Sequence, residues 1–136
     1  MGGGSLLARI ILIDDDPIFA NLVQQQLTKA GHKVSYNEGA FGALTAVRKA
    51  QPDLILVDVE MPEIKGPKLV DYLRGRDVGS ARILLMSSIP EPELQRAAQS
   101  YGADGYICKG WGVVQIATRV AEALHARGGL SARRQS

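Results

Sequence analysis

Acidic residues stand where two short apolar runs end. Asp14 and Asp15 directly follow the run 10–13, and Asp58 directly follows the run 54–57. Two unit charges about 4 Å apart repel by about 4 kcal/mol at an effective dielectric constant near 20, so carboxylates that meet either take up protons or share a cation. A sparse set of carboxylates fits Mg2+ better than Ca2+, which prefers a fuller shell of oxygen ligands. The three aspartates therefore predict a Mg2+ site, which Mn2+ could also occupy.

A hydroxyl and an ammonium group end two further apolar runs. Ser87 follows the run 83–86, and Lys109 follows the run 105–108. The lysine and a divalent ion together would neutralise three carboxylates, so that an incoming phosphoryl group would meet a site without net charge. Each residue alone has a simpler explanation as a helix N-terminus, a strand end, a turn or a solvated side chain. Their coincidence at four run ends favours one shared site.

Apolar runs alternate with amphipathic stretches along the whole chain. Three of the five runs lack polar alternation, which is typical of strands in a parallel sheet covered by helices on both faces. The first amphipathic stretch is expected to form a helix with Asp16 as N-cap and Pro17 as its first residue, ending at Gly31. The last is expected to end at Gly128. The strands are expected at 9–13, 33–36, 54–57, 83–86 and 105–108.

Strict alternation of strands and helices predicts an α/β fold with a doubly wound five-stranded parallel sheet, (βα)5, because crossovers between parallel strands are right-handed. In such sheets the functional crevice lies beyond the carboxyl ends of the strands. The second strand ends at 36–38 without a catalytic side chain. Placing that strand at an edge lets the other polar strand ends converge, so the flavodoxin-like order 2-1-3-4-5 is predicted.

Length and composition limit the possible classes of protein. The 136 residues fit one domain with one core, and 46% hydrophobic with 22% charged residues is the composition of an ordinary globular chain. A formal net charge of +2 gives no reason to expect direct binding to nucleic acid or to a membrane. A single cysteine cannot form an internal disulfide, and no apolar run approaches the ~20 residues of a membrane span. A cytoplasmic location is expected.

The ends of the chain differ from its interior. Residues 1–7 are expected to be a flexible leader or an expression scar, because they are rich in glycine and lack the pattern of a signal peptide. Residues 8–127 are expected to form the domain. Residues 128–136 begin with two glycines and are expected to be a flexible tail or a truncated linker.

Four segments of the chain, in order and at the right spacing, match one family. They are IILIDDDP at 10–17, PDLILVD at 52–58 with Met61, Pro62 and Gly66, ILLMS at 83–87, and GADGYICK at 102–109. Together they resemble the receiver domain of bacterial response regulators, which act in two-component and phosphorelay signalling and share a chemotaxis-regulator-like fold. The resemblance extends over about residues 8–127.

The resemblance implies a role for each acidic position. Asp58 would be the phospho-acceptor, which attacks a phosphohistidine on a sensor histidine kinase or a phosphotransfer protein. Asp15, Asp58 and the backbone carbonyl of Glu60 would ligate Mg2+ directly. Asp14 would contact the ion through a water molecule.

The resemblance also implies a switch. Ser87 and Lys109 would each bind a phosphoryl oxygen, and movement of Ser87 would open space into which Tyr106 turns. The face formed by the fourth helix, fifth strand and fifth helix would then change shape. That face would control a downstream protein or an output domain, and it could carry a phosphorylation-dependent homodimer. Such a chain is a self-phosphorylating and self-dephosphorylating switch rather than an enzyme that turns over a separate substrate.

Four positions are expected to tune this chemistry or depart from the commonest family pattern. Ser87 stands where threonine is more usual, and Lys109 is followed by Gly110 rather than by proline. Glu60 and Ile89 would border the path of the hydrolytic water. Because bulky Ile89 would shield the acyl phosphate, a phosphoryl lifetime of minutes or longer is expected.

Alternative functions remain open at this point. A Mg2+-dependent phosphatase of the haloacid-dehalogenase type also uses an aspartate nucleophile, but no threonine follows 14–16 before Thr28. A flavin or mononucleotide module would need a glycine- or hydroxyl-rich loop after the first strand, where this chain is acidic. A degenerate receiver would only bind protein partners. A stand-alone regulator and a receiver from a longer protein are both compatible with the sequence.

Overall fold

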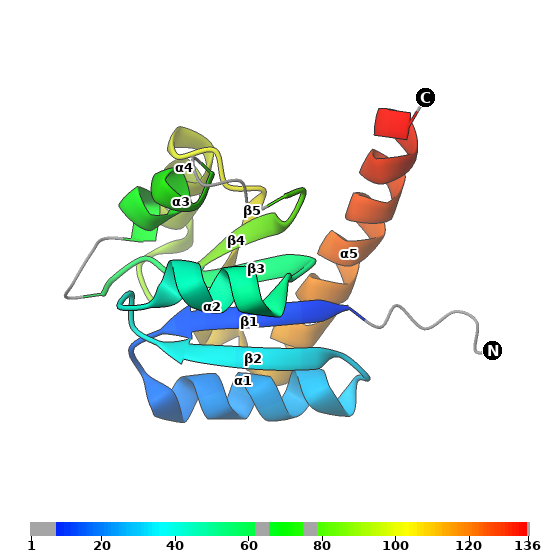
Figure 1. Cartoon of the computed structure of the whole chain (residues 1–136). Helices are drawn as coiled ribbons and strands as arrows, with labels where there is room; N and C mark the ends of the chain where they lie inside the picture. Colours follow the sequence, from blue (N-terminus) through cyan, green and yellow to red (C-terminus); the bar gives the residue numbers. More distant parts are fainter. Residues whose placement is uncertain (1–7, 62–65, 75–78, 136) are drawn as a thin grey trace.

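The computed structural model describes residues 8–61, 66–74 and 79–135 (Figure 1). Strands and helices alternate along the chain, as predicted. The elements are β1 (Arg9–Asp14), α1 (Pro17–Lys29), β2 (Lys33–Glu38), α2 (Ala43–Ala50), β3 (Leu54–Asp58), α3 (Gly66–Arg74), β4 (Arg82–Ser87), α4 (Glu91–Ser100), β5 (Gly105–Cys108), a short 3-10 helix η2 (Lys109–Trp111), and α5 (Val113–Gln135).

The five strands form one parallel sheet in the order β2-β1-β3-β4-β5, which confirms the predicted fold class and strand order. The central strands are buried on both faces because helices cover both sides. Every residue of β3 is buried, as is every residue of β4. The two edge strands are more exposed, and β2 contains no fully buried residue.

Alternate residues of each central strand enter two separate cores. Ile11 and Ile13 of β1 pack with residues of α2, α3 and α4 on one side of the sheet. Ile10 and Leu12 pack with residues of α1 and α5 on the other. Because strand side chains point alternately to opposite faces, unbroken apolar runs such as 10–13 are required to fill both cores.

The first helix begins as the sequence predicts. Oδ1 of Asp16 accepts hydrogen bonds from the amides of Ile18 (3.1 Å) and Phe19 (3.2 Å), and Pro17 is the first helical residue. Gly31 follows the helix with a φ of 102°, a left-handed conformation that favours glycine. The Asp16 cap fixes where α1 starts, three residues after Asp14, the last residue of β1.

The last helix is longer than expected. The prediction that it ends at Gly128 is wrong, because α5 continues through Gly128 and Gly129 to Gln135. Glycine disfavours a helix interior by about 1 kcal/mol but keeps its amide donor, so it weakens a helix without stopping it. The tail expected at 128–136 is thus helical up to 135, while the leader expected at 1–7 lies outside the described residues. Within the described ranges, no helix is both long and apolar enough to cross a bilayer.

Candidate functional site

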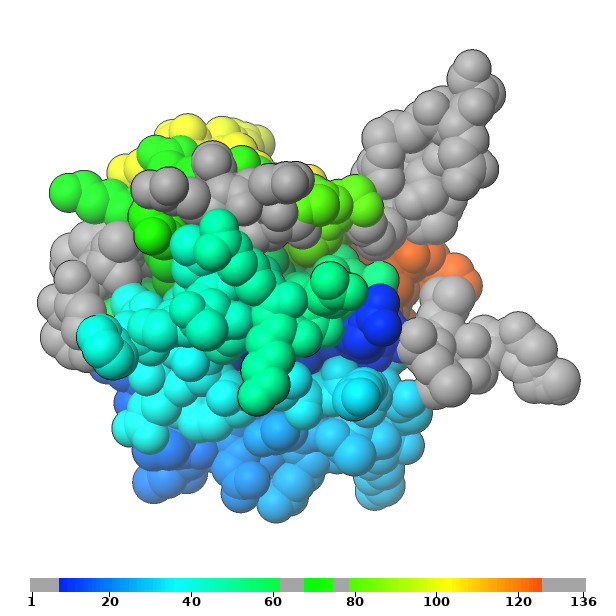
Figure 2. Space-filling view, in the orientation of Figure 1, coloured from blue at the N-terminus to red at the C-terminus, as the bar shows by residue number. Residues whose placement is uncertain are grey.

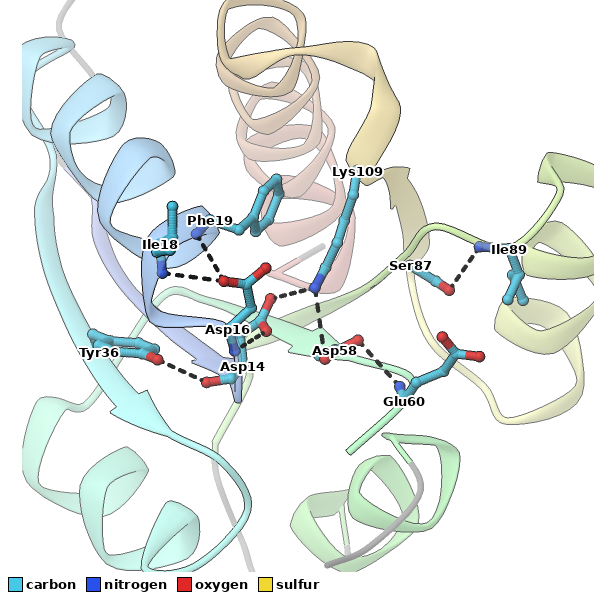
Figure 3. Close-up of polar contacts among 10 residues, drawn as sticks. All are labelled: Asp14, Asp16, Ile18, Phe19, Tyr36, Asp58, Glu60, Ser87, Ile89 and Lys109. Carbon is cyan, nitrogen blue, oxygen red and sulfur yellow. Dashed lines mark hydrogen bonds and ion pairs between the residues drawn. The ribbon is translucent and has the colours of Figure 1, made fainter. Parts of the chain in front are cut away.

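The polar residues predicted to converge lie together at the carboxyl ends of the strands (Figure 3). Asp14 ends β1, Asp58 ends β3, Ser87 ends β4, and Lys109 follows β5. One carboxylate oxygen from each of Asp14, Asp15 and Asp58 lies within 4.8 Å of the others. The prediction that the three acidic side chains meet is therefore confirmed.

Asp14 is held from several directions. Its side chain is fully buried, and Oδ1 accepts a 2.8 Å hydrogen bond from the amide of Asp16. Its main-chain carbonyl accepts hydrogen bonds from the phenol of Tyr36 (2.9 Å) and the amide of Gly39 (3.0 Å). Oδ2 lies 2.8 Å from Nζ of Lys109. The position of this carboxylate is thus fixed through both its backbone and its side chain.

Asp58 lies beside Asp14 and shares the same cation. Its Oδ1 accepts a 3.1 Å hydrogen bond from the amide of Glu60, and its Oδ2 lies 3.6 Å from Nζ of Lys109. Only 4% of the residue is exposed. Burial raises the pKa of Asp58 to about 7; the Glu60 amide and Lys109 oppose this rise, and the charge of Asp14 adds to it. Without a further cation, Asp58 therefore gains and loses its proton near neutral pH.

Lys109 is the one cation that contacts this acidic cluster among the described residues. Its ammonium also lies 4.8 Å from the centre of the Phe19 ring, a cation–π distance. Burial lowers the pKa of Lys109, but the hydrogen bond and charge of Asp14 and the charge of Asp58 outweigh it, so the net pKa is raised. The side chain is charged at neutral pH and points into the cluster (Figure 3).

Ser87 lies on the Ile89 side of the site (Figure 3). The residue is 1% exposed, and its Oγ accepts a 3.0 Å hydrogen bond from the amide of Ile89. Within the described part of the chain, the Ser87 hydroxyl donates no hydrogen bond. The hydroxyl is therefore oriented through its oxygen and keeps its proton available for donation.

The donor set fits a hard divalent cation. Three carboxylates face a single ammonium group, so the cluster carries excess negative charge. Apart from the ion pair with Lys109, the buried Oδ2 of Asp14 has no hydrogen-bond donor in the described ranges. Asp15 is open to solvent and offers an access side. The backbone carbonyl of Glu60 remains a predicted ligand, since the structure shows only its amide, bound to Asp58.

Tyr106 lies on β5, where the sequence predicts a switch. Its phenol donates a 2.7 Å hydrogen bond to Oε2 of Glu91 in the first turn of α4. Its ring centre lies 6.1 Å from that of Trp111, with the planes tilted by 47°. Trp111 also packs against the core between the sheet and α5, and the peptide between Lys109 and Gly110 is trans.

Three contacts of the site were not predicted from the sequence. Tyr36 binds the backbone of Asp14, Phe19 lies under the ammonium of Lys109, and Glu91 holds Tyr106. For Phe19 a signal existed, because it follows the Asp16 cap by one helical turn and so lies at the same end of α1 as the acidic cluster. For Tyr36 and Glu91 the sequence offers only a polar side chain near a strand end or helix start.

Comparison with known proteins now identifies the family. A family model for the response regulator receiver domain matches residues 10–121 of this chain. The chain therefore belongs to the response-regulator receiver family of two-component signalling. The class defined by the fold and the acidic site is the one that the sequence motifs predicted.

Curated relatives support this assignment. The chain is 35% identical over 121 residues to the DNA-binding dual master transcriptional regulator RpaA of Synechocystis, covering 87% of this chain and 49% of that protein. It is 27% identical over 118 residues to the chemotaxis protein CheY of Halobacterium salinarum, covering 87% of this chain and 98% of that protein. The chain thus spans nearly all of that CheY but about half the length, or less, of four other curated relatives.

Solved structures show the same fold. The chemotaxis response regulator CheY4 of Vibrio cholerae superposes with a TM-score of 0.79 at 24% identity, covering 86% of this chain and 98% of that one. NtrX of Brucella abortus superposes with a TM-score of 0.86 at 21% identity, covering 96% of this chain and 29% of that one. Because the sequence identities are below 25%, these superpositions show a shared fold and nothing further.

Proposed function

We propose that this chain is a phosphoryl-accepting signalling switch in which Asp58 is the acceptor. The observation that carries the proposal is the placement of Asp58, buried beside the ammonium of Lys109 and within 4.8 Å of two other carboxylates. A carboxylate in such surroundings is poised to exchange its proton or its cation for a new partner. Family membership supports the same reading.

The proposed reaction moves one phosphoryl group. A carboxylate oxygen of Asp58 attacks the phosphorus of a phosphohistidine on a sensor kinase or phosphotransfer protein. The new O–P bond forms an acyl phosphate, the P–N bond breaks, and the departing imidazole takes up a proton. Water later attacks the acyl phosphate and releases inorganic phosphate, so the chain is a switch rather than an enzyme for a separate substrate.

The residues around Asp58 have separate tasks in this reaction. Lys109 can shift its ammonium from Asp58 Oδ2 to a phosphoryl oxygen, and the free proton of the Ser87 hydroxyl can be donated to another. Such positioning and charge neutralisation are what phosphoryl transfer requires. Mg2+, or Mn2+ in its place, would neutralise further charge on the transferred oxygens. Asp15, Asp58 and the Glu60 carbonyl would hold this ion directly, and Asp14 through water.

The proposed output is the face formed by α4, β5 and α5. Movement of Ser87 toward the phosphoryl group would release Tyr106 from Glu91 and let its ring turn inward, which changes that face. The partner is a downstream protein, an output domain or a second phosphorylated copy of the chain. We propose a cytoplasmic setting and no direct contact of this domain with nucleic acid or membrane.

The decisive experiment is phosphorylation by a small donor. The chain is incubated with Mg2+ and acetyl phosphate, and its intact mass is measured for the wild type, Asp58→Asn and Asp71→Asn. Asp71 is an exposed residue of α3 and serves as a matched control. A Mg2+-dependent adduct of one phosphoryl group in the wild type and the control, absent from Asp58→Asn, is expected.

Two results would contradict the proposal. An adduct that persists in Asp58→Asn would place the acceptor elsewhere, for example at Asp14, as in a phosphatase of the haloacid-dehalogenase type. No adduct in the wild type, together with normal Mg2+ binding, would identify a degenerate receiver that only binds partners.

A further inference from the structure

A second recess lies at the opposite end of the sheet from the acidic site. It is a pocket of about 500 Å3 between the first halves of β1 and β2 and the last turn of α2. Figure 1 shows the elements around it, with α2 crossing in front of β1 and β3 and leaving β2 in view. Figure 2 shows the same side of the molecule with its side chains filled in.

Three cations line this pocket. Arg9 and Lys33 are paired in register as the first residues of two parallel strands, so their side chains leave the same face of the sheet. Lys49 comes from the last turn of α2. No acidic residue is among the described residues that line the pocket, and none of these three side chains forms an ion pair within the described ranges.

The fold explains part of this charge, since Lys33 lies on the edge strand β2, where charged side chains are common. Lys49 has a structural reason, because a cation in the last turn favours the carbonyl end of a helix. Arg9 and Lys33 stand at strand starts, where no such dipole acts. The carboxylate of Asp53 accepts a 2.8 Å hydrogen bond from the backbone amide of Arg9 and forms no ion pair with the Arg9 guanidinium. A chain with a net charge of only +2 thus gathers three unpaired cations in one recess.

The other walls of the pocket are mixed, with Tyr36 and Gln51 as polar residues beside apolar and small ones. Ile11 is buried at its floor, while Ala46 and Ala50 of α2 occupy little space and leave room above the strands. Ser35 adds a hydroxyl beside Ile11, its partner in the strand register. A volume of about 500 Å3 is that of a small-ligand pocket, which commonly measures roughly 300–1,000 Å3.

We infer that this pocket binds a small phosphorylated ligand of the nucleoside diphosphate class, independently of the acceptor site. The phosphates would lie against Arg9, Lys33 and Lys49, since charge-assisted hydrogen bonds from guanidinium and ammonium groups suit phosphate oxygens. The less polar part would lie against the half-buried Ala46 and Ala50, above the buried Ile11. The pocket would thereby give the chain an input separate from phosphorylation.

The test uses ADP as the probe, in buffer with EDTA so that the acidic site cannot hold a metal nucleotide. Amide chemical shifts of the ¹⁵N-labelled chain are followed during titration. Shifts centred on Ile11, Ser35 and Ala46 are expected in the wild type and equally in Asp58→Asn. The double variant Lys33→Gln/Lys49→Gln is expected to bind about tenfold more weakly or worse, because it lacks two charge-assisted contacts.

A matched double variant separates the pocket from general charge. Lys29→Gln/Lys68→Gln removes the same charge from exposed positions outside the pocket and is expected to bind ADP like the wild type. Adenosine, without phosphate, and pyrophosphate, without the nucleoside, are both expected to bind more weakly than ADP. Each protein's amide spectrum without ligand shows that it is folded.

Several outcomes would overturn the inference. These are no shifts at millimolar ADP, shifts confined to the surroundings of Asp58 and Lys109, or equal weakening in the two double variants. Adenosine binding as tightly as ADP would remove the role of the cations. Pyrophosphate binding as tightly as ADP would remove the role of the apolar wall and with it the assigned ligand class.

Discussion

The phenol of Tyr106 donates a 2.7 Å hydrogen bond to Oε2 of Glu91, which ties the first half of β5 to the first turn of α4. This bond, together with burial and the charge of Glu91, raises the pKa of the phenol above its usual value of 10. Glu91, which holds the orientation of Tyr106, therefore belongs to the proposed output face and not to the acceptor site.

Removing that bond should release Tyr106. In Glu91→Ala we expect the pKa of the phenol to fall toward its usual value, because its acceptor and the nearby negative charge are gone. Ultraviolet titration of the phenolate, with Tyr106→Phe as the difference reference, measures it. Glu93→Ala changes an exposed carboxylate in the same turn and serves as the control. An unchanged phenol pKa in Glu91→Ala would show that the bond does not hold Tyr106 in solution.

Stability without metal should fall as the pH rises. The folded chain binds the Asp58 proton with a pKa of about 7, whereas an unfolded aspartate has a pKa of about 3.9. The folded state therefore holds more protons between these values, so this contribution to stability is complete below about pH 4 and is lost as pH rises through about 7. The loss is on the order of a few kcal/mol.

Urea unfolding in EDTA across this pH window measures the effect. Asp58→Asn cannot ionise at that position and is expected to lose much less stability over the same range. Mg2+ should stabilise the wild type more at the high end of the window, where the ion does not compete with a proton. Parallel pH profiles of the wild type and Asp58→Asn would contradict the raised pKa.

Lys109→Met should leave the acidic cluster without its contacting cation. Because Asp14 is fully buried, we expect the free energy of unfolding in EDTA to fall by about 2 kcal/mol or more. Added Mg2+ should recover more stability than in the wild type, while phosphorylation by acetyl phosphate should be strongly slowed. Lys68→Met, at an exposed position of α3, is the control. Undiminished stability in EDTA would mean that the ion pair is not important in solution.

Ser87→Ala tests the hydroxyl. The amide of Ile89 would lose its acceptor, at a cost of about 1 kcal/mol, and the phosphoryl group would lose a donor. We expect phosphorylation at least about tenfold slower, as for other lost donors to a transferring group. Ser87→Thr keeps the hydroxyl and should restore the rate, whereas Ser88→Ala, one residue later and exposed, should leave it unchanged. Equal rates for Ser87→Ala and the wild type would remove Ser87 from the site.

The lifetime of the acyl phosphate should depend on Ile89. This side chain is half-buried beside Ser87, and we expect it to shield the phosphoryl group for minutes or longer. Ile89→Ala should shorten that lifetime several-fold by admitting water, as followed by loss of the mass adduct after removal of the donor. Val114→Ala, at an exposed position of α5, is the control. Loss of the label within seconds in the wild type would contradict the shielding role.

The sequence predicted those features that follow from periodicity and chain order. Unbroken apolar runs marked the buried strands, and the rule that parallel strands share a carboxyl end brought Asp14, Asp58 and Lys109 together before any geometry was known. The cap at Asp16 was predictable because it depends on residues close in sequence.

Contacts between side chains that are far apart in the sequence could not be predicted in this way. The bond from Tyr36 to Asp14 depends on the register of β2 against β1, and the bond from Tyr106 to Glu91 depends on how α4 packs. The error at Gly128 has another cause, because helix propensity is a small local preference that the rest of a helix can override. The cluster of three cations in the second pocket could not be predicted either, because the three side chains come from elements that are distant in sequence.

The bond from Tyr36 to the Asp14 carbonyl has a consequence for how the acidic site withstands changes in pH. Burial, with the charges of Glu38, Asp14 and its neighbours, raises the pKa of the Tyr36 phenol to about 12. The donor therefore keeps its proton throughout the range in which Asp58 gains and loses one. The carboxylates can change charge and partners while the backbone that carries them remains anchored to the edge strand by a group that does not titrate with them.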